Sequence, residues 1–416
     1  GGGVAMRRLA YWLSLAMIFT IPWEGAFHLP GLGTVATVMG LVTGAFWIGT
    51  VILTGHVRAP TNAFLFVLMV FTSWVVLSVY WSPDPTESMG SVLRWLQSLV
   101  FVLILWDLFP TRARLLVGMQ AYVLGACVAI GGAIVNYLGS RAFYTNMDRY
   151  SLGDTNPDGY GFIVALGVPI ACYLIASREL PPLFRFVNLA YLPLAFVGIA
   201  LSGTRTASIG AAVGLLYGLA ALTRLRLVAR VAVVASLSGA LFFLLPILQP
   251  LASFQRLGTT GTEVTEGDLN GRLSQWEQGF RAFTEHPVLG VGTNMYRSVN
   301  TLDKVAHNSY LSVLVELGLV GFALFATILG LVVSAIWTLP RWDRRFWITV
   351  FVVWAIGAST LTWEHRKTTW LFLTFAWAAA AIRARAPVRD RIVLPETAPQ
   401  LGGSRRPLPS VAGGSR

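Results

Sequence analysis

The chain has 416 residues, of which 55% are hydrophobic and 12% are charged, and its mean hydropathy is +0.65. A soluble protein needs far more charge to cover its surface, so this composition excludes a soluble globular protein and indicates an integral membrane protein. The net charge of +12 does not indicate a nucleic-acid partner, because most arginines fall in short loops between apolar runs. The two cysteines, Cys127 and Cys172, lie inside apolar runs and support neither a disulfide framework nor a cysteine metal site.

Twelve apolar segments follow one another along the chain. A helix needs about 20 mostly apolar residues to cross the hydrocarbon core of a membrane. The first segment follows Arg7 and Arg8 without a cleavage site of small residues, so we expect it to be retained rather than removed as a signal peptide. We therefore predict an all-α integral membrane protein with about twelve transmembrane helices, near 8–22, 31–54, 61–81, 89–108, 114–138, 159–177, 186–201, 206–223, 230–249, 308–338, 346–362 and 367–383.

Arginine alternates between loops and thereby predicts the sidedness of the chain. Short cytoplasmic loops carry an excess of Arg and Lys. With a cytoplasmic N-terminus, thirteen loop arginines fall inside: Arg7, Arg8, Arg58, Arg112, Arg114, Arg178, Arg185, Arg224, Arg226, Arg230, Arg341, Arg344 and Arg345. The opposite loops are mostly acidic, so both termini are predicted in the cytoplasm and the number of spans is predicted to be even.

The sequence predicts four parts. Residues 1–249 contain the first nine spans, and residues 250–307 form a long periplasmic loop. Residues 308–386 contain the last three spans, and residues 387–416 are rich in Gly, Ser, Pro and Arg and are expected to form a disordered cytoplasmic tail. The loop is basic, yet long loops are translocated largely regardless of charge, so its charges need a reason other than topology.

An amphipathic helix is predicted inside this loop. It begins near Asn270, a plausible N-cap, and ends before Pro287. At 100° per residue, Arg272 lies beside an arc of large apolar side chains, whereas Arg281 points the opposite way. The arc consists of Leu273, Trp276, Phe280 and Phe283. We expect Arg272 to face the membrane body and Arg281 to be solvated; the alternative for Arg272 is an arginine that snorkels at the lipid interface.

Arg205 lies in a short polar break, Ser202–Thr206, between two spans on the outward side. A guanidinium group presents fixed paired donors that suit the oxygens of a phosphate. Binding of an oxyanion is therefore one interpretation. The alternative is an interfacial arginine paired with lipid headgroups, although the outward loops otherwise contain few arginines.

His307 immediately precedes a long span on the same side. Histidine accepts a proton near neutral pH, which suits a general base at the boundary of water and lipid; the alternatives are a helix cap and a surface residue. Glu316 lies nine residues deeper on the opposite helix face and needs a partner at that depth. Arg94 is the predicted partner, with a structural role.

Several catalytic motifs are missing. The sequence contains no Asp-x-Asp, no His-Glu-x-x-His and no P-loop pattern. The sequence therefore predicts no metal site and no cofactor, and it gives no sign of nucleic-acid binding.

Three stretches resemble one family. They are residues 202–206 with Arg205, residues 272–292 with Arg272, and residues 307–321 with His307. In order, spacing and predicted side they are similar to the O-antigen ligase/polymerase superfamily of bacterial envelope glycosyltransferases. The likeness covers roughly residues 150–375, and Asn156 and Lys367 are weaker matches.

This resemblance implies a GT-C-like membrane enzyme. An O-antigen ligase transfers a glycan from undecaprenyl pyrophosphate to a sugar hydroxyl of lipid A-core at the periplasmic face of the inner membrane, without metal or ATP. The resemblance implies that His307 is the general base and that Arg205 and Arg272 hold the pyrophosphate. It implies supporting roles for Asn156, Asn308 and Lys367.

Three functions remain open. The length and the twelve spans favour the ligase, and an O-antigen polymerase of the same superfamily is the alternative. A flippase or transporter of lipid-linked oligosaccharides is an alternative from another class. It requires polar residues at mid-membrane depth along several spans, and the sequence has few of them.

Overall fold

Long α-helices dominate the computed structural model, which describes residues 2–31, 33–57, 62–144, 147–153, 155–177, 179–258 and 272–385. The predicted cap Asn270, the predicted tail 387–416 and the loop arginines Arg58 and Arg178 lie outside these residues. The first half contains α1 (Gly2–Thr20), η1 (Ile21–Ala26), β1 (His28–Leu29), β2 (Gly33–Thr34), α2 (Val35–Thr54), α3 (Ala63–Leu77), η2 (Ser78–Trp81), α4 (Pro85–Leu108), α5 (Arg112–Leu138), α6 (Pro157–Ala176) and α7 (Pro182–Ser202). The second half contains α8 (Arg205–Leu222), α9 (Leu227–Leu248), α10 (Ala252–Gly258), α12 (Arg272–Glu285), η4 (Tyr296–Val299), α13 (Ser309–Trp337), α14 (Arg341–Ala358) and α15 (Lys367–Arg385).

Each of the twelve predicted spans coincides with one long helix, and the all-α membrane fold is confirmed. Ten helices of the described chain are long and apolar enough to cross a membrane. The other two predicted spans are α14 and α15. The first begins with four charged residues within five positions, and the second contains three threonines that are all buried. Because α15 packs on α4, α5, α13 and α14, its polar groups face protein rather than lipid.

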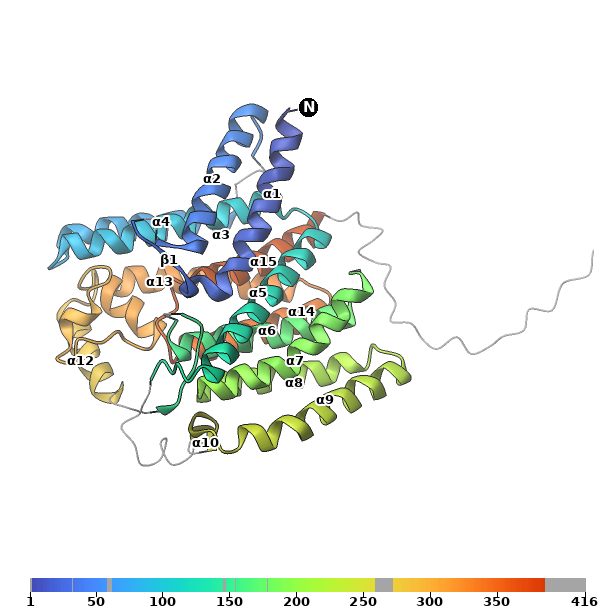
Figure 1. Cartoon of the computed structure of the whole chain (residues 1–416). Coiled ribbons are helices and arrows are strands. Elements are labelled where there is room, and N and C mark those ends of the chain that lie inside the picture. The colour runs from blue at the N-terminus through green and yellow to red at the C-terminus, as the bar shows by residue number, and fades with distance from the viewer. Residues whose placement is uncertain are drawn as a thin grey trace, which may run out of the picture.

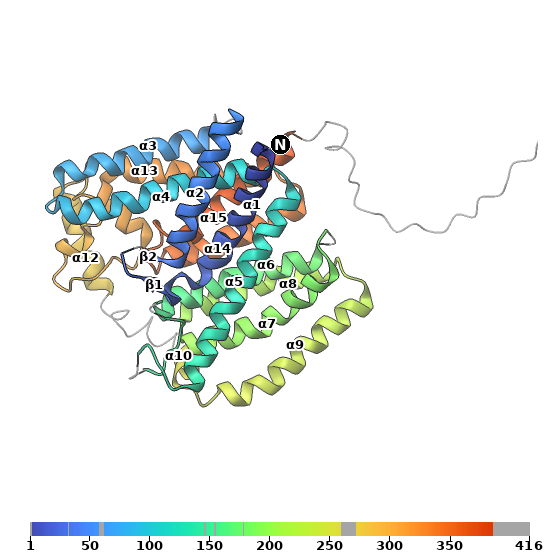
Figure 2. The ribbon, with the colours of Figure 1, turned by 45° about the horizontal axis from the view of Figure 1, so that its top comes forward.

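The helices form a bundle, and α1, α2 and α9 lie at its periphery. Figures 1 and 2 show α1 and α2 side by side, projecting from one side of the bundle, and α9 along its outer edge. Side chains of α9 such as Phe242 and Phe243 are about three quarters exposed, as expected for a helix that faces lipid. The hydrophobic core lies between α4, α5, α6, α13 and α15.

The N-termini of α6, α8, α13 and α15 meet at one end of this bundle, which we call the site end. Thr204 before α8 contacts Asp158 of α6, and Trp363 before α15 packs its ring on Phe162 of α6 with 5.2 Å between the centroids. At the opposite end, Arg112 binds Glu179 at 2.7 Å and Asp343 at 2.9 Å. This separation matches the predicted alternation of the loops, in which the site end faces outward.

A break in α13 is filled by a segment of the long loop. Gly318 has φ 66°, which interrupts the helix, and an added side chain there would collide with the Val288 carbonyl. The freed carbonyl of Glu316 accepts the Gly292 amide at 2.9 Å, and Leu319 donates to the Pro287 carbonyl at 2.8 Å. The close approach requires glycine, because any Cβ would meet the facing backbone. The loop is thereby anchored to the membrane bundle.

Candidate active site

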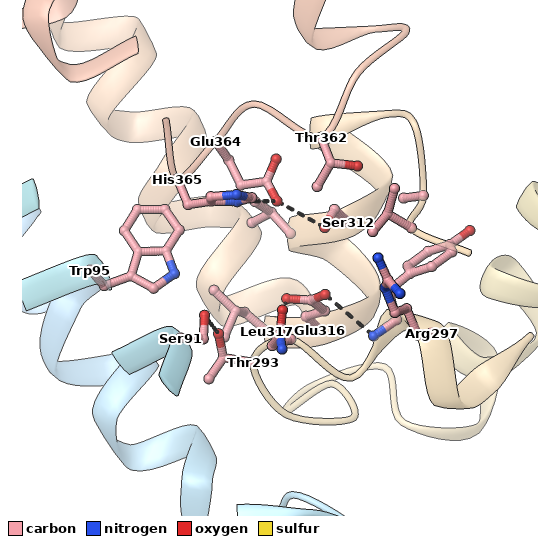
Figure 3. Close-up of a pocket in the computed structure, with 15 residues that line it drawn as sticks. Ser91, Trp95, Thr293, Arg297, Ser312, Glu316, Leu317, Thr362, Glu364 and His365 are labelled. Atoms are coloured by element: carbon pink, nitrogen blue, oxygen red, sulfur yellow. Dashed lines mark hydrogen bonds and ion pairs between the residues drawn. The ribbon is translucent and has the colours of Figure 1, made fainter. Parts of the chain in front are cut away.

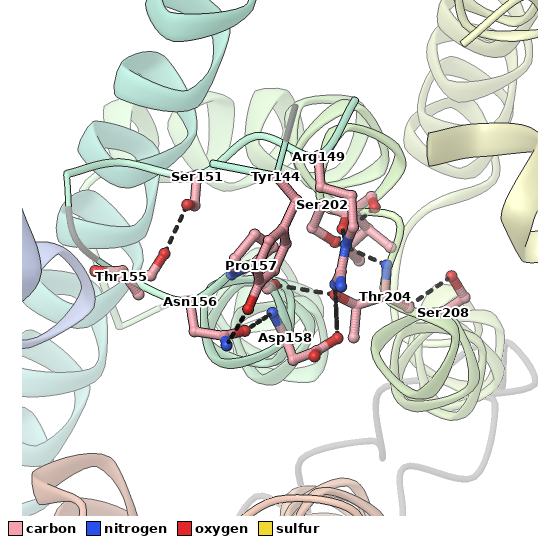
Figure 4. A network of polar contacts seen from close by, with 11 residues as sticks. Tyr144, Arg149, Ser151, Thr155, Asn156, Pro157, Asp158, Ser202, Thr204 and Ser208 are labelled. Atoms are coloured by element: carbon pink, nitrogen blue, oxygen red, sulfur yellow. Dashed lines mark hydrogen bonds and ion pairs between the residues drawn. The ribbon is translucent and has the colours of Figure 1, made fainter. Parts of the chain in front are cut away.

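A buried arginine organises the site end. The side chain of Arg149 is 4% exposed and donates from Nε to the Ser202 carbonyl at 2.6 Å (Figure 4). Its Nη2 donates to Asp158 Oδ1 at 2.6 Å and to Thr204 Oγ1 at 3.1 Å. Three segments are joined in this way: the loop after α5, the start of α6 and the break between α7 and α8. No motif in the sequence singled out Arg149, so its central position was missed.

The polar break predicted around Arg205 is present. Gly203 ends α7 in a left-handed conformation with φ 61°, and Thr204 precedes α8. The Thr204 hydroxyl donates to the Pro157 carbonyl at 3.0 Å, which holds the N-termini of α6 and α8 together. Arg205 is the first residue of α8 and is half-buried. Both helix N-termini add partial positive charge at this point, which favours an anion.

Arg272 begins α12 and is half-buried, whereas Arg281 is 72% exposed and pairs with Glu277. The predicted difference between the two arginines is therefore confirmed. Burial lowers the pKa of Arg272, the charge of Asp158 raises it, and that of Arg149 lowers it, so the two charged groups lie near the guanidinium. An arginine with so high an ordinary pKa stays charged.

The predicted apolar arc of this helix is wrong in detail. Leu273 and Phe280 are about half exposed, whereas the buried stripe consists of Gln275, Gly279 and Ala282. The reason is Tyr296, whose hydroxyl crosses at Gly279 and donates to the Gln275 carbonyl at 2.9 Å. Small side chains on α12 allow this ring to approach, and large ones do not.

His307 precedes Asn308, the N-cap of α13, and has φ 48°, a left-handed conformation that is costly for a residue with a side chain. Its backbone amide donates to Thr362 Oγ1 at 3.1 Å. Burial, followed by the charge of Arg272, lowers the pKa of His307, and Asp158 partly offsets this effect. The imidazole is therefore neutral at neutral pH and able to accept a proton.

Two of the three predicted site residues, Arg272 and His307, lie near Asp158. The charge of its carboxylate raises the pKa of both side chains. Asp158 also accepts a hydrogen bond from Thr204, which precedes the third predicted residue, Arg205, in the chain. Trp276 Nε1 donates to the Ala306 carbonyl at 2.8 Å, which fixes α12 beside His307. The only feature of the sequence that pointed to Asp158 is its position as an acidic residue in the first turn of a capped helix.

The three supporting residues have structural contacts of their own. Asn156 and Asn308 are N-caps: the side-chain oxygen of Asn156 accepts the Asp158 amide at 2.8 Å, and that of Asn308 accepts the Tyr310 amide at 3.0 Å. Lys367 Nζ donates to Glu24 Oε2 at 2.6 Å, which ties α15 to η1. These contacts account for the position of each side chain, and direct substrate contacts remain a prediction.

Glu316 is held differently from the prediction. Its two oxygens accept backbone amides, Oε2 from Asn294 at 2.8 Å and Oε1 from Tyr296 at 3.3 Å. Arg94, the predicted partner, is close enough for its charge to act on Glu316, and it donates to the side chain of Asn294 at 3.2 Å. Within the described residues, no cluster of three or more His, Cys, Asp or Glu side chains is placed to hold a metal ion.

The fold and this site define a multi-pass, all-α membrane protein with cationic groups and a neutral histidine at one end. Residues 190–326, which include Arg205, Arg272 and His307, match the family described as O-Antigen ligase. The chain is 24% identical over 286 residues to the "Exopolysaccharide production protein ExoQ" of Rhizobium meliloti (strain 1021). This alignment covers 63% of the chain and 63% of the relative, less than two thirds of its length. The resemblance to the O-antigen ligase superfamily is thereby confirmed.

Proposed function

We propose that this protein is an O-antigen ligase, a glycosyltransferase that moves a glycan from undecaprenyl pyrophosphate to a sugar hydroxyl of lipid A-core. The observation that carries the proposal is the juxtaposition of a half-buried arginine and a neutral histidine around Asp158. One group suits a departing diphosphate, and the other suits an incoming alcohol. The family match over residues 190–326 contains all three proposed site residues.

In the proposed reaction the acceptor hydroxyl oxygen forms a bond to the anomeric carbon of the glycan. The anomeric C–O bond to the pyrophosphate breaks, and the bonding electrons leave with the lipid pyrophosphate. His307 takes the proton of the hydroxyl as general base. Arg205 and Arg272, with the N-terminus of α8, stabilise the charge that develops on the leaving group.

The proposed setting is the bacterial inner membrane. The arginine-rich loop end that contains Arg112 faces the cytoplasm, as do both termini, and the site end faces the periplasm. Both substrates are anchored in lipid, so they reach the site from the outer leaflet of that membrane. The half-exposed Leu273 and Phe280 of α12 support this access, because they offer an apolar surface beside Arg272.

A second function of the same class is an O-antigen polymerase, in which the acceptor is another lipid-linked glycan. The similarity to a relative named for exopolysaccharide production favours this alternative. A flippase differs from both, because it leaves donor and acceptor chemically unchanged.

The experiment that tests the proposal uses purified protein in detergent with a glycan linked to undecaprenyl pyrophosphate. Lipid A-core and a second lipid-linked glycan are supplied together as competing acceptors. Ligation to lipid A-core is expected, and elongation of the lipid-linked glycan would establish the polymerase instead. If neither acceptor yields a product, both enzymatic functions are contradicted and transport is the remaining alternative.

A further inference from the structure

A small cavity lies next to the backbone of His307 and is lined by neither Arg205 nor Arg272. It shares Thr362 with His307, because Thr362 lines the cavity and its hydroxyl accepts the His307 amide. Its other polar walls include Glu316, Glu364, His365 and Arg297 (Figure 3). The cavity therefore adjoins the proposed general base but not the groups assigned to the pyrophosphate.

Glu364 supplies one free acceptor to this cavity. The residue is 4% exposed, and its Oε1 accepts the Ser312 hydroxyl at 3.0 Å and lies 3.6 Å from His365 Nδ1. Its Oε2 has no hydrogen-bond partner among the described residues, and Figure 3 shows that oxygen turned toward Thr362. A buried carboxylate oxygen without a partner is costly, so a ligand that donates a hydrogen bond is favoured there.

The dimensions restrict what the cavity accepts. Its volume is about 40 Å³, room for roughly three waters and too little for a whole sugar ring. Both oxygens of Glu316 already accept backbone amides, whereas Glu364 Oε2 has no partner among the described residues. A bound cation needs several ligands, and in the described part of the chain no three His, Cys, Asp or Glu side chains are grouped to hold one. Hydroxyl groups on the edge of a sugar fit both the size and the chemistry.

We propose that this cavity receives one or two hydroxyl groups of the acceptor sugar, with Glu364 Oε2 accepting a hydrogen bond from one of them. This inference rests on the proposed function and adds the position of the acceptor. A hydroxyl held there orients the sugar so that a neighbouring hydroxyl lies at His307. Because hydroxyl recognition by a buried acceptor is highly discriminating, Glu364 helps to select the acceptor sugar.

The test measures binding without turnover. The His307→Asn protein, with and without Glu364→Gln, is titrated separately with lipid A-core and with undecaprenyl pyrophosphate. Glutamine keeps the volume and leaves an oxygen for Ser312. We expect the Kd for lipid A-core to rise about tenfold, as for the loss of one charged hydrogen bond, and the Kd for undecaprenyl pyrophosphate to stay within about twofold. Glu277→Gln on the exposed face of α12 is the matched control and should change neither Kd.

The outcomes separate this inference from the proposed function. An unchanged Kd for lipid A-core means that the cavity holds only water, and an equal rise for both ligands means that Glu364 is structural; either result overturns the inference. If the Kd for lipid A-core depends on Glu364 but the wild-type protein transfers no glycan, the proposed function alone is overturned. No binding of lipid A-core to the parent would overturn both. If Glu364→Gln does not fold, Ser312→Ala, which removes the hydroxyl that orients Glu364, is measured in the same way and should weaken only lipid A-core.

Discussion

His307 and Thr362, 55 positions apart in the chain, are joined by a hydrogen bond of 3.1 Å from the His307 amide to the Thr362 hydroxyl. The bond holds the backbone of His307 in its left-handed conformation at the start of α13. The position of the proposed base therefore depends on the loop between α14 and α15, outside the family match over residues 190–326.

Thr362→Val should lower the rate of glycan transfer about tenfold, because it leaves the His307 amide without its acceptor and lets the imidazole shift. Thr362→Ser keeps the hydroxyl and should retain most of the activity. The measurement is initial rate in detergent with both substrates saturating. Equal activity of the valine and serine proteins would contradict a positioning role.

Replacement of His307 should remove the general base. We expect His307→Asn and His307→Ala to lower the rate at least about a hundredfold. Asparagine is the better matched variant, since it tolerates positive φ more readily than alanine does. Thermal unfolding in detergent should show that the asparagine protein stays folded. Substantial transfer by this folded variant would exclude His307 as the base.

The pH dependence should follow the lowered pKa of His307. The neutral imidazole is the active form, so activity falls as pH drops through a pKa that lies below the ordinary 6.5. Lys304 is one of the charges that lower this pKa, so Lys304→Gln should raise it and move the acid limb of kcat/KM to higher pH. Arg281→Gln, which alters an exposed pair on α12, is the control and should leave the limb in place. A limb that moves to lower pH in the Lys304 variant would contradict this electrostatic account.

The two arginines of α12 should differ sharply in importance. Arg272→Lys should lower transfer about a hundredfold, because lysine keeps the charge but cannot form the paired hydrogen bonds of a guanidinium group. Arg281→Ala should stay near wild type, since that side chain is 72% exposed. Transfer rates are measured at varied concentrations of the glycan donor, so that weaker donor binding is seen as a higher KM. Similar tolerance of both changes would disprove the assignment of Arg272.

Arg149→Gln should destabilise the protein, because it leaves the largely buried Asp158 carboxylate without its charged partner. The expected loss is about 3 kcal/mol of unfolding free energy, typical of a broken buried ion pair. Arg141→Gln in the same loop is the control, since Arg141 is exposed. The melting temperatures of the two variants in detergent are compared. A melting temperature of Arg149→Gln as high as that of Arg141→Gln would contradict the organising role of this network.

The sequence by itself determined the helices and several local features of the proposed site. A membrane span is a local property of about 20 successive apolar residues, and helix ends are marked by caps such as Asn308. Both can therefore be predicted from the sequence without knowledge of the fold. The same holds for Arg205, which is unusual as an arginine in an outward loop, and for His307, which lies in the polar segment before α13. Both features can be recognised from neighbouring residues in the sequence. The opposite directions of Arg272 and Arg281 follow from helical periodicity alone.

Only the tertiary structure decided how these residues are held. Arg149 with Asp158, His307 with Thr362, and Lys367 with Glu24 pair across separations from 9 to 343 residues, and no periodic pattern encodes them. The buried face of α12 is set by Tyr296 crossing at Gly279, and the cavity of Glu364 is enclosed by four separate segments. Packing selects these contacts because side chains must fill the space between helices at high density, a condition on the whole bundle rather than on any one segment.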